Sequence, residues 1–306
     1  MSRAAMLVVG ESLIDIVERA GQDPVEYVGG SPANVAVGLA RLGHRVQLAT
    51  WFGPDDRGER IRAHLEQDGV AVVPGSDAAQ RTSTAMARLD ASGAADYVFD
   101  ITCDLPELDD VAAPPLVHVG SISAVLEPAA AKTAALLDAV AATATVSYDP
   151  NARPAIMGDS AGARERVEAL VARSDVVKVS DEDIAWLAPG EAIADVARAW
   201  LGRGAAVVVV TRGGSGSEGY AGDGVAVSVP APATTVVDTV GAGDSFMAGV
   251  IDGLARAGLV GAAQRDRLRR IDATTLRDVF ERAGTSAAIT VSRAGANPPT
   301  AAELAD

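Results

Sequence analysis

Residues 238–246 (DTVGAGDSF) combine a Gly-Ala-Gly turn with one carboxylate at the start of an apolar segment. Glycine lets the backbone bend tightly and approach a ligand closely, and the first amides of a helix favour anions because they lack partners inside the helix. Asp244 would lie beside an anion held by the amides of Gly241, Ala242 and Gly243, within reach of an attacking hydroxyl. An anion cradle next to a base is the minimal equipment for moving a phosphoryl group onto an alcohol. The same run also fits an ordinary turn followed by a helix-start carboxylate, which the helix dipole favours.

The elements that must position this run alternate along the chain. Short apolar, β-branched runs cover residues 6–9, 46–49, 70–73, 116–119, 145–147, 176–179 and 206–211, and segments of helical periodicity cover 32–42, 57–67, 127–141, 163–173, 193–201 and 246–254. For the first helix we expect Ser31 as the N-cap, Pro32 at the first position and Gly43 as the stop. Buried strands alternating with helices predict an α/β fold with a mostly parallel sheet covered on both faces.

Two stretches break this alternation. Residues 12–28 and 82–101 look like antiparallel strands, the second with a turn at 90–93. We expect them to form a small β-sheet that projects as a lid over the carboxyl ends of the parallel strands, where ligands bind in such folds. Both could instead be edge strands of the main sheet. No internal repeat or linker divides the chain, so residues 1–306 are expected to form a single domain with this lid.

Composition excludes several classes of protein. The chain is 48% hydrophobic and 22% charged, which is typical of a soluble globular protein. Its net charge of −15 argues against a nucleic-acid partner, which would need a basic face. No apolar run approaches the roughly 20 residues that a membrane helix needs. We expect a cytoplasmic location, because the N-terminus lacks the features of a signal peptide and the one cysteine, Cys103, suits a reducing compartment.

Three familiar functional motifs are excluded: two because the flanking residues do not fit them, and one because it is absent. Residues 214–219 match the dinucleotide fingerprint G-x-G-x-x-G, but residues 220–229 look like a glycine-broken strand where that motif needs a helix. Residues 158–162 match the nucleophile elbow G-x-S-x-G, but no strand leads into them, and every histidine precedes Ser160. A Walker A motif is absent from the sequence.

With these pieces placed, the chain resembles the ribokinase-like (PfkB) family of sugar and nucleoside kinases over nearly its whole length. Two separated signatures carry the resemblance: residues 29–36 (GGSPANVA), followed by 39–43 (LARLG), and residues 238–246. Smaller agreements lie at 53–58 (GPDDRG) and 211–216 (TRGGSG). The resemblance implies a three-layer α/β/α sandwich with a mostly parallel central sheet and a small β-sheet lid.

The resemblance also implies roles for individual residues. Asp244 would be the general base that takes a proton from a sugar hydroxyl as it attacks the γ-phosphate of ATP, with the amides of residues 241–244 stabilising the transferred group. The residues expected around the sugar are Asp15, Gly29, Gly30, Asn34 and Phe99. Carboxylate and amide side chains suit sugar hydroxyls because each can take paired hydrogen bonds.

Residues 149–154 (DPNARP) bear on the identity of the substrate. They follow a strand, and their D-P-N-x-R pattern resembles that of the fructokinase and 2-keto-3-deoxygluconate kinase branches. Arg153 would bring a fixed positive charge to the transferring phosphate or to the oxygens of the acceptor. A keto acid would call for further basic residues on the lid, where Asp100 follows Phe99 and only Arg88 is basic on the preceding strand, so fructose is favoured. The alternatives are a 2-keto-3-deoxygluconate kinase, a ribokinase, a nucleoside kinase whose lid would stack a purine on Tyr97 and Phe99, or a binding protein without catalysis.

On the nucleotide side, the resemblance places Thr211, Gly213 and Gly216 along ATP, with Gly243 and with Lys178 as a nearby positive charge. Where the family commonly has N-x-x-E, this chain departs from the pattern and has Ser180 and Asp183. Ser180 is expected to contact a phosphate of ATP, and Asp183 is expected to bind Mg²⁺ indirectly. The alternative is that the two residues only cap a helix. Asp238, with the backbone carbonyls around residues 293–295, resembles a monovalent-cation site, and the cation would be K⁺. The expected partners are a small sugar and ATP with Mg²⁺, and the exposed edges of the lid could pair with a second copy of the chain.

Overall fold

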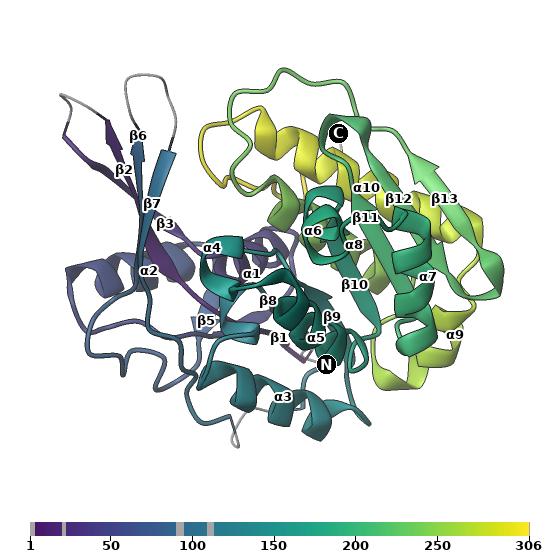
Figure 1. The fold of residues 1–306 in the computed structure, drawn as a ribbon, viewed down its shortest axis with the longest axis horizontal. Helices are drawn as coiled ribbons and strands as arrows, with labels where there is room; N and C mark the ends of the chain where they lie inside the picture. Colours follow the sequence, from purple (N-terminus) through teal and green to yellow (C-terminus); the bar gives the residue numbers. More distant parts are fainter. Residues whose placement is uncertain (1–3, 20–22, 90–94, 109–112, 306) are drawn as a thin grey trace.

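The computed structural model describes residues 4–19, 23–89, 95–108 and 113–305 of the 306-residue chain. A nine-stranded sheet forms its centre (Figure 1). The strand order is β13 (Ala226–Val229), β12 (Ser217–Ala221), β11 (Val207–Thr211), β10 (Val176–Ser180), β9 (Thr145–Asp149), β8 (Leu116–Gly120), β1 (Met6–Val9), β4 (Val46–Ala49) and β5 (Val70–Val72). All neighbours from β11 to β5 pair in parallel, and only β12 and β13 join in antiparallel. The prediction of a mostly parallel sheet is therefore confirmed.

Helices cover both faces of this sheet. Val207 and Val209 of β11 belong to one apolar core, and Val208 and Val210 belong to a second core on the opposite face. The first core includes side chains of α1 (Ser31–Arg41), α2 (Asp56–Gln67), α8 (Ala242–Arg256), α9 (Arg265–Arg269) and α10 (Ala273–Val291). The second includes side chains of α3 (Ala129–Val140), α4 (Pro154–Met157), α5 (Ser160–Val171), α6 (Asp181–Leu187) and α7 (Ile193–Arg203). The result is the three-layer α/β/α arrangement expected from the sequence.

Small residues bring α8 close to its neighbours. A Cβ atom added to Gly249 would lie 2.7 Å from Ala283 Cα of α10, and one added to Gly38 of α1 would lie 2.8 Å from Ala248 Cβ. Phe246 and Phe280 pack together at the same interface, with ring centroids 6.2 Å apart. These close contacts fix where the first turn of α8 lies relative to α1 and α10.

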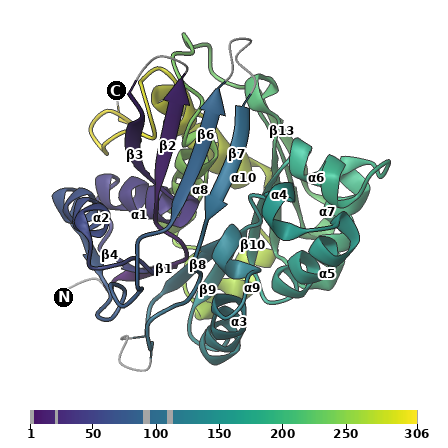
Figure 2. The same ribbon diagram turned by 60° about the vertical axis from the view of Figure 1, so that its left-hand side comes forward.

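A separate four-stranded sheet projects from the body (Figure 2). Its order is β3 (Val25–Gly29), β2 (Leu13–Arg19), β6 (Thr84–Leu89) and β7 (Ala95–Asp100). The alternative that these are edge strands of the main sheet is therefore wrong. The expectation that all of these strands are antiparallel holds for the two outer pairs only, because β2 and β6 pair in parallel. The turn expected at 90–93 lies outside the described residues.

Hydrogen bonds and ion pairs tie the small sheet to the body at its base. Ser12 Oγ lies 2.8 Å from Thr50 Oγ1, and the carboxylate of Asp55 accepts from the Thr82 amide at 2.8 Å and from the Thr82 hydroxyl at 2.6 Å. On β3, Glu26 forms ion pairs with Arg57 and Arg60 of α2. The small sheet therefore has defined attachment points just after β4, at the turn before α2, and on α2 itself.

The rejected motifs fold as their flanking residues indicate. Residues after Gly219 complete β12 and then form β13, so the dinucleotide fingerprint lacks its helix. Residues before Ser160 form α4 rather than a strand, and Asp159 caps α5 by accepting from the Gly162 amide. Within the described residues, no helix is both long enough and apolar enough to cross a membrane.

Candidate active site

The turn before α8 requires glycine at residue 241. Gly241 is the N-cap of α8 with φ 75°, and a Cβ atom there would lie 2.6 Å from Ala296 Cβ. The left-handed conformation turns the chain directly into the helix, so Ala242, Gly243 and Asp244 form its first turn. The Ala242 amide donates to the Thr239 carbonyl at 3.3 Å, whereas the amides of Gly243 and Asp244 have no acceptor within the helix and favour an anion.

Asp244 is buried, with 8% of its surface exposed, and α1 holds both of its carboxylate oxygens. The Ser31 hydroxyl donates to Oδ1 at 2.6 Å, and the Asn34 side-chain amide donates to Oδ2 at 2.8 Å. The structure thus brings together two motifs that lie more than 200 residues apart in the chain. The prediction that Ser31 caps α1 is wrong, because Gly30 is the N-cap and the Ser31 hydroxyl is committed to Asp244.

Asp15 approaches the same place from the small sheet. It pairs with Tyr27 of β3 and Ala85 of β6, and Ala85 in turn pairs with Phe99 of β7, so these residues form one row across the sheet. Burial raises the pKa of the Asp15 carboxyl to about 6, the positive charge of Arg153 opposes this rise, and the negative charge of Asp244 adds to it. Those influences show that Asp15 lies within electrostatic reach of both residues.

The glycines expected at the sugar site create close approaches. A Cβ atom on Gly29 would lie 2.0 Å from Asp15 Oδ2, so the missing side chain makes room for this carboxylate. Gly30 has φ 109°, and a Cβ atom there would lie 2.5 Å from the Glu11 carbonyl oxygen. The pair therefore lets β3 pass directly into α1 beside Asp15 and Asn34.

Arg153 is partly buried and folds back on its own loop. Its Nη1 donates to the Asn151 side-chain oxygen at 2.8 Å and to the carbonyls of Asn151 and Ala152 at 3.0 Å each. Asn151 has φ 39°, a left-handed conformation that is uncommon outside glycine. The loop thus positions one guanidinium at the carboxyl end of β9, near Asp15.

A buried ion pair lies against the cradle. Lys178 Nζ donates to Asp149 Oδ2 at 2.6 Å, and a Cβ atom added to Gly243 would lie 3.0 Å from the same Nζ. Burial raises the pKa of Asp149 to about 6 although Lys178 pulls it down. Burial lowers the pKa of Lys178, but the hydrogen bond to Asp149 and the charges of Asp149, Asp244 and Asp183 raise it overall. The ammonium group of Lys178, paired with Asp149, therefore lies next to the first turn of α8.

His118 lies close to this ion pair on β8. Burial and the charge of Lys178 lower its pKa to about 3, and its Nδ1 lies 3.0 Å from Ser147 Oγ. A neutral imidazole is therefore part of the sheet interior, and no metal-ligand role follows for it.

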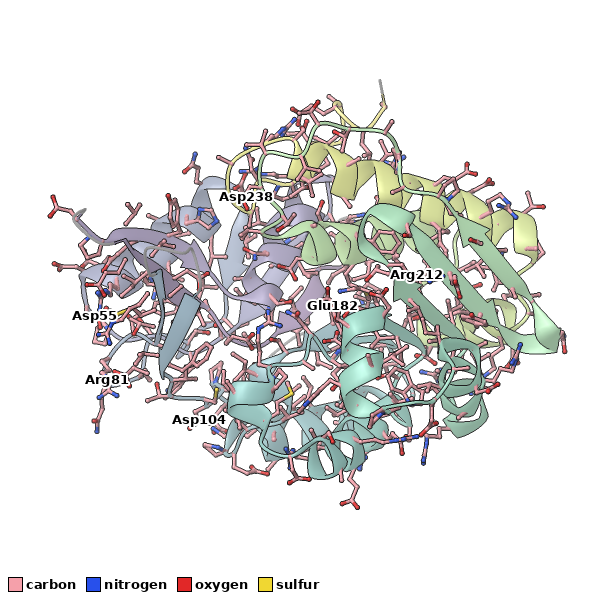
Figure 3. The ribbon with its side chains drawn as sticks, turned by 45° about the horizontal axis from the view of Figure 1, so that its top comes forward. Asp55, Arg81, Asp104, Glu182, Arg212 and Asp238 are labelled. Atoms are coloured by element: carbon pink, nitrogen blue, oxygen red, sulfur yellow. The ribbon has the colours of Figure 1, made fainter. Side chains whose placement is uncertain are left out.

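Ser180 and Asp183 form the capping box of α6, with the Asp183 amide 2.9 Å from Ser180 Oγ. Asp183 also accepts from the Ala152 amide at 3.0 Å, which ties α6 to the loop that carries Arg153. Figure 3 shows the neighbouring Glu182 at the start of α6. The described part of the chain contains no cluster of three or more His, Cys, Asp or Glu side chains that could hold a metal ion.

Thr211 ends β11 in register with Ser180 of β10, so both lie at the same edge of the sheet. The turn Gly213–Ser215 follows, and Gly216 has φ 99° with a virtual Cβ only 2.1 Å from the Val229 carbonyl oxygen. Arg212 at this turn, labelled in Figure 3, pairs with Glu218 at 2.5 Å. The glycines here serve a tight turn against the end of β13.

Asp238 organises the segment that leads into the cradle (Figure 3). Its Oδ1 accepts from the Val240 amide at 3.0 Å, and its Oδ2 accepts from the Gly295 amide at 2.8 Å. The amides of Val237 and Asp238 donate to the carbonyl of Val291 at the end of α10. Residues expected near a monovalent cation, Asp238 and the 293–295 segment, are therefore adjacent.

The sequence did not identify Asp149 as a site residue. Its partner Lys178 lies on another strand, and no known motif has this spacing between an aspartate and a lysine. The Ser31 contact had no signal either, because a serine before proline is equally typical of a helix cap. By contrast, the structure places Asn34, Asp15 and Arg153, which the resemblance assigns to the site, close to Asp244 or to one another.

Comparison with known proteins identifies the class. A sequence model of the family described as pfkB family carbohydrate kinase matches residues 4–303, and the chain belongs to this family. A fructokinase of Rhizobium leguminosarum bv. trifolii is 35% identical over 263 residues, which cover 81% of this chain and 79% of that protein.

Solved structures agree in fold over nearly the full length. The crystal structure of a fructokinase with bound ATP from Xylella fastidiosa has a TM-score of 0.84 at 26% identity, covering 98% of this chain and 97% of that one. A fructokinase from Vibrio cholerae, in a form with bound fructose, ADP and calcium ion, has a TM-score of 0.79 at 25% identity, covering 100% and 99%. The chain is a carbohydrate kinase with the fold of these enzymes.

Proposed function

We propose that this carbohydrate kinase is an ATP-dependent fructokinase, which transfers the γ-phosphate of ATP to a hydroxyl of fructose. The observation that carries the proposal is the position of Asp244. Its buried carboxylate lies beside the anion cradle of α8, accepts a hydrogen bond from Asn34, and lies within electrostatic reach of Asp15. Fructokinases among the relatives and structural neighbours support fructose as the acceptor.

The sugar would lie between the small sheet and α1. Asp15 and Asn34 offer acceptors and a donor for its hydroxyls, and Phe99 lies in the same cross-strand row as Asp15. The small sheet would act as a lid that excludes water, which would otherwise accept the phosphate. Arg88 of β6 is already paired with Glu18 at 3.0 Å, and Arg81, which precedes β6, is paired with Asp100 of β7. This pairing supports a neutral sugar over a keto acid.

Phosphoryl transfer would proceed beside the first turn of α8. Asp244 takes the hydroxyl proton as the sugar oxygen bonds to the γ-phosphorus and the bond to the β-phosphate oxygen breaks. Amides of residues 241–244, with Lys178 behind Gly243 and Arg153 nearby, stabilise negative charge on the transferring group. The amides are the larger contribution, because donors of this kind act in a site that excludes water.

Magnesium would be held mainly by the phosphates of ATP, because Mg²⁺ commonly binds through substrate phosphates and the described residues contain no protein cluster for it. Asp183 is occupied by backbone amides and could contact such an ion only through water. Asp238 with residues 293–295 stays our prediction for a K⁺ site, tested by activation with K⁺ against Na⁺.

Replacement of Asp244 tests the proposal. Asp244→Asn should lower kcat by roughly 100- to 10,000-fold, the usual contribution of a general base, with fructose binding by calorimetry largely kept. Asp159→Asn is the matched control, since Asp159 is also a carboxylate at a helix start but lies at the cap of α5. If Asp244 were only a helix-start residue, the two variants would behave alike, and that outcome would refute the base assignment.

A panel of acceptors tests the substrate. Fructose should show the highest kcat/KM with Mg-ATP, compared with ribose, 2-keto-3-deoxygluconate and adenosine. A higher value for any of the other three would replace fructose in the proposal. A well-folded protein that binds sugar and ATP but releases no ADP would instead be a non-catalytic homologue.

A homodimer through the small sheet also remains our prediction. Val25 and Tyr27 on β3 and Val98 on β7 are 40%, 52% and 43% exposed, and both strands are edges of that sheet. Light scattering at several protein concentrations tests it.

A cytoplasmic location is supported by the one cysteine, Cys103, whose thiol has a pKa raised to about 12 by burial and by the Glu11 charge.

A further inference from the structure

Ser31 makes a contact that no helix-capping role explains. Its hydroxyl donates to Asp244 Oδ1 at 2.6 Å, and the residue is 8% exposed. Gly30 rather than Ser31 is the N-cap of α1, and no side-chain cap bond accompanies it. Hydrogen bonds from a hydroxyl to a carboxylate are short and about twice as strong as neutral ones. The serine is therefore built into the environment of the base.

The two donors to Asp244 differ in their surroundings. The Ser31–Asp244 bond is buried, whereas the Asn34–Asp244 bond and Asn34 itself are only partly buried. Oδ1 thus faces the protein and Oδ2 faces the more open side, where Asn34 lies. Each carboxylate oxygen can accept two hydrogen bonds. Oδ2 can therefore still receive a substrate hydroxyl on its partly buried side, beside Asn34.

We propose that Ser31 is a positioning residue that holds Oδ1 of Asp244 so that Oδ2 receives the proton of the attacking sugar hydroxyl. The inference rests on the proposed function, in which Asp244 is the base. In the step, the sugar O–H bond breaks and its proton moves to Oδ2. The sugar oxygen bonds to the γ-phosphorus of ATP, and the bond to the bridging oxygen breaks to release ADP. Ser31 keeps its hydrogen bond to Oδ1 throughout and touches no reacting atom.

The chemistry of the contact explains why a donor is needed there. A carboxylate can rotate about its last side-chain bond, and that torsion has a broad, roughly two-fold preference. The short bond from Ser31 on α1, together with the Asn34 bond to Oδ2, removes this freedom and keeps Oδ2 on the partly buried side. A misplacement of a catalytic group by about 1 Å can cost roughly 100-fold in rate.

Ser31→Ala tests the proposal. We expect kcat to fall roughly 10- to 100-fold, up to the loss that a misplacement of about 1 Å can cause, while the fructose Kd and the KM for Mg-ATP stay close to wild type and the Tm falls by only a few degrees. Ser31→Thr, which keeps the hydroxyl, should restore most of kcat. Ser174→Ala is the matched control, since the buried Ser174 hydroxyl donates to the Leu170 carbonyl at 2.8 Å beyond α5 and should leave kcat unchanged.

A double variant separates positioning from structure. In an Asp244→Ala background, Ser31→Ala should cause no further loss of kcat, because Ser31 then has no carboxylate to orient. Additive losses would overturn the proposal, and so would a Ser31→Ala enzyme with wild-type kcat or with an equal loss in Tm and in both substrate affinities. If Asp244→Ala itself keeps wild-type kcat, the proposed function fails. If Asp244→Ala is inactive while Ser31→Ala is fully active, the role of Ser31 alone fails.

Discussion

Single residues decide how this site responds to pH, and Asp15 gives the clearest case. Burial raises its pKa to about 6, and the Asp244 charge adds to this rise while Arg153 opposes it. Only the ionised carboxylate offers all its oxygen lone pairs to sugar hydroxyls. At about pH 5, one unit below that pKa, roughly a tenth of the carboxylate remains. The KM for fructose should therefore rise as pH falls through about 6, with a smaller change in the KM for Mg-ATP, measured by initial rates across pH.

Asp15→Asn is the control for this pH dependence, because the amide does not titrate and its KM for fructose should be nearly flat between pH 5 and 7. Stability should change in the opposite sense. A carboxyl with a raised folded pKa stabilises the fold below its unfolded pKa of 3.8, and this contribution is lost as pH rises through about 6. The Tm of Asp15→Asn relative to wild type should consequently increase with pH. A wild-type KM that stays constant to pH 5 would contradict the assignment of Asp15 to the sugar.

At the scale of residues, the sequence predicted the site residues that belong to recognisable motifs. It did not predict contacts between residues that belong to no shared motif. Asp244, Asn34 and Arg153 stand in recognisable patterns, and the structure gathers them. Ser31 looked like a helix cap because serine before proline has the same local chemistry in both roles. The Asp149–Lys178 pair could not be seen, because neighbouring parallel strands bring these residues together across a crossover helix.

At the scale of elements, the start of α8 depends on a glycine inside the helix. Gly243→Ala would place a methyl group 3.0 Å from Lys178 Nζ, in the first turn where the phosphate is expected. The kcat/KM for Mg-ATP should fall roughly 100-fold, comparable to the loss of one oxyanion donor, with fructose binding unchanged. Steady-state kinetics and fructose calorimetry check this.

The matched control is Gly202→Ala in α7, where a Cβ atom would meet nothing within 4 Å. It should leave kinetics unchanged and stabilise the protein by about 0.5–1 kcal/mol, the usual gain for alanine over glycine inside a helix. Equal kinetics for the two glycine variants would show that the first turn of α8 does not contact the phosphate.

Strands and helices of the body were largely predictable. β1 and β4 match their predicted ranges, because short β-branched runs between turn residues have few other conformations. The order and direction of strand pairing in the small sheet were harder to predict from the sequence. β2 and β6 pair in parallel although each belongs to an antiparallel hairpin-like pair, and residue patterns within a strand do not specify which distant strand lies beside it.

At the scale of the whole molecule, the site depends on two sheets that are held together. Asp15 and Phe99 come from the small sheet, Asn34 and Asp244 from helices of one face, and Lys178 from the main sheet. A ligand that binds only when these parts are assembled stabilises the folded state by RT ln(1 + [L]/Kd), which is about 2.7 kcal/mol at 100 times Kd. For a chain of this length, such a gain raises Tm by about 5 °C. Fructose and an unreactive ATP analogue should each produce a shift of this size, measured by calorimetric or fluorescence melting.

Variants should show which part of the site produces each Tm shift: the small sheet for fructose, and the start of α8 for the ATP analogue. Asp15→Asn should lose most of the shift caused by fructose and keep the shift caused by the ATP analogue, since Asp15 comes from the small sheet, which is expected to contact the sugar rather than the nucleotide. Gly243→Ala should show the reverse pattern, because its methyl group faces the phosphate side. If either variant lost both shifts to the same extent, the two ligands would not occupy separate parts of the site, and the division of labour between the small sheet and the start of α8 would be wrong.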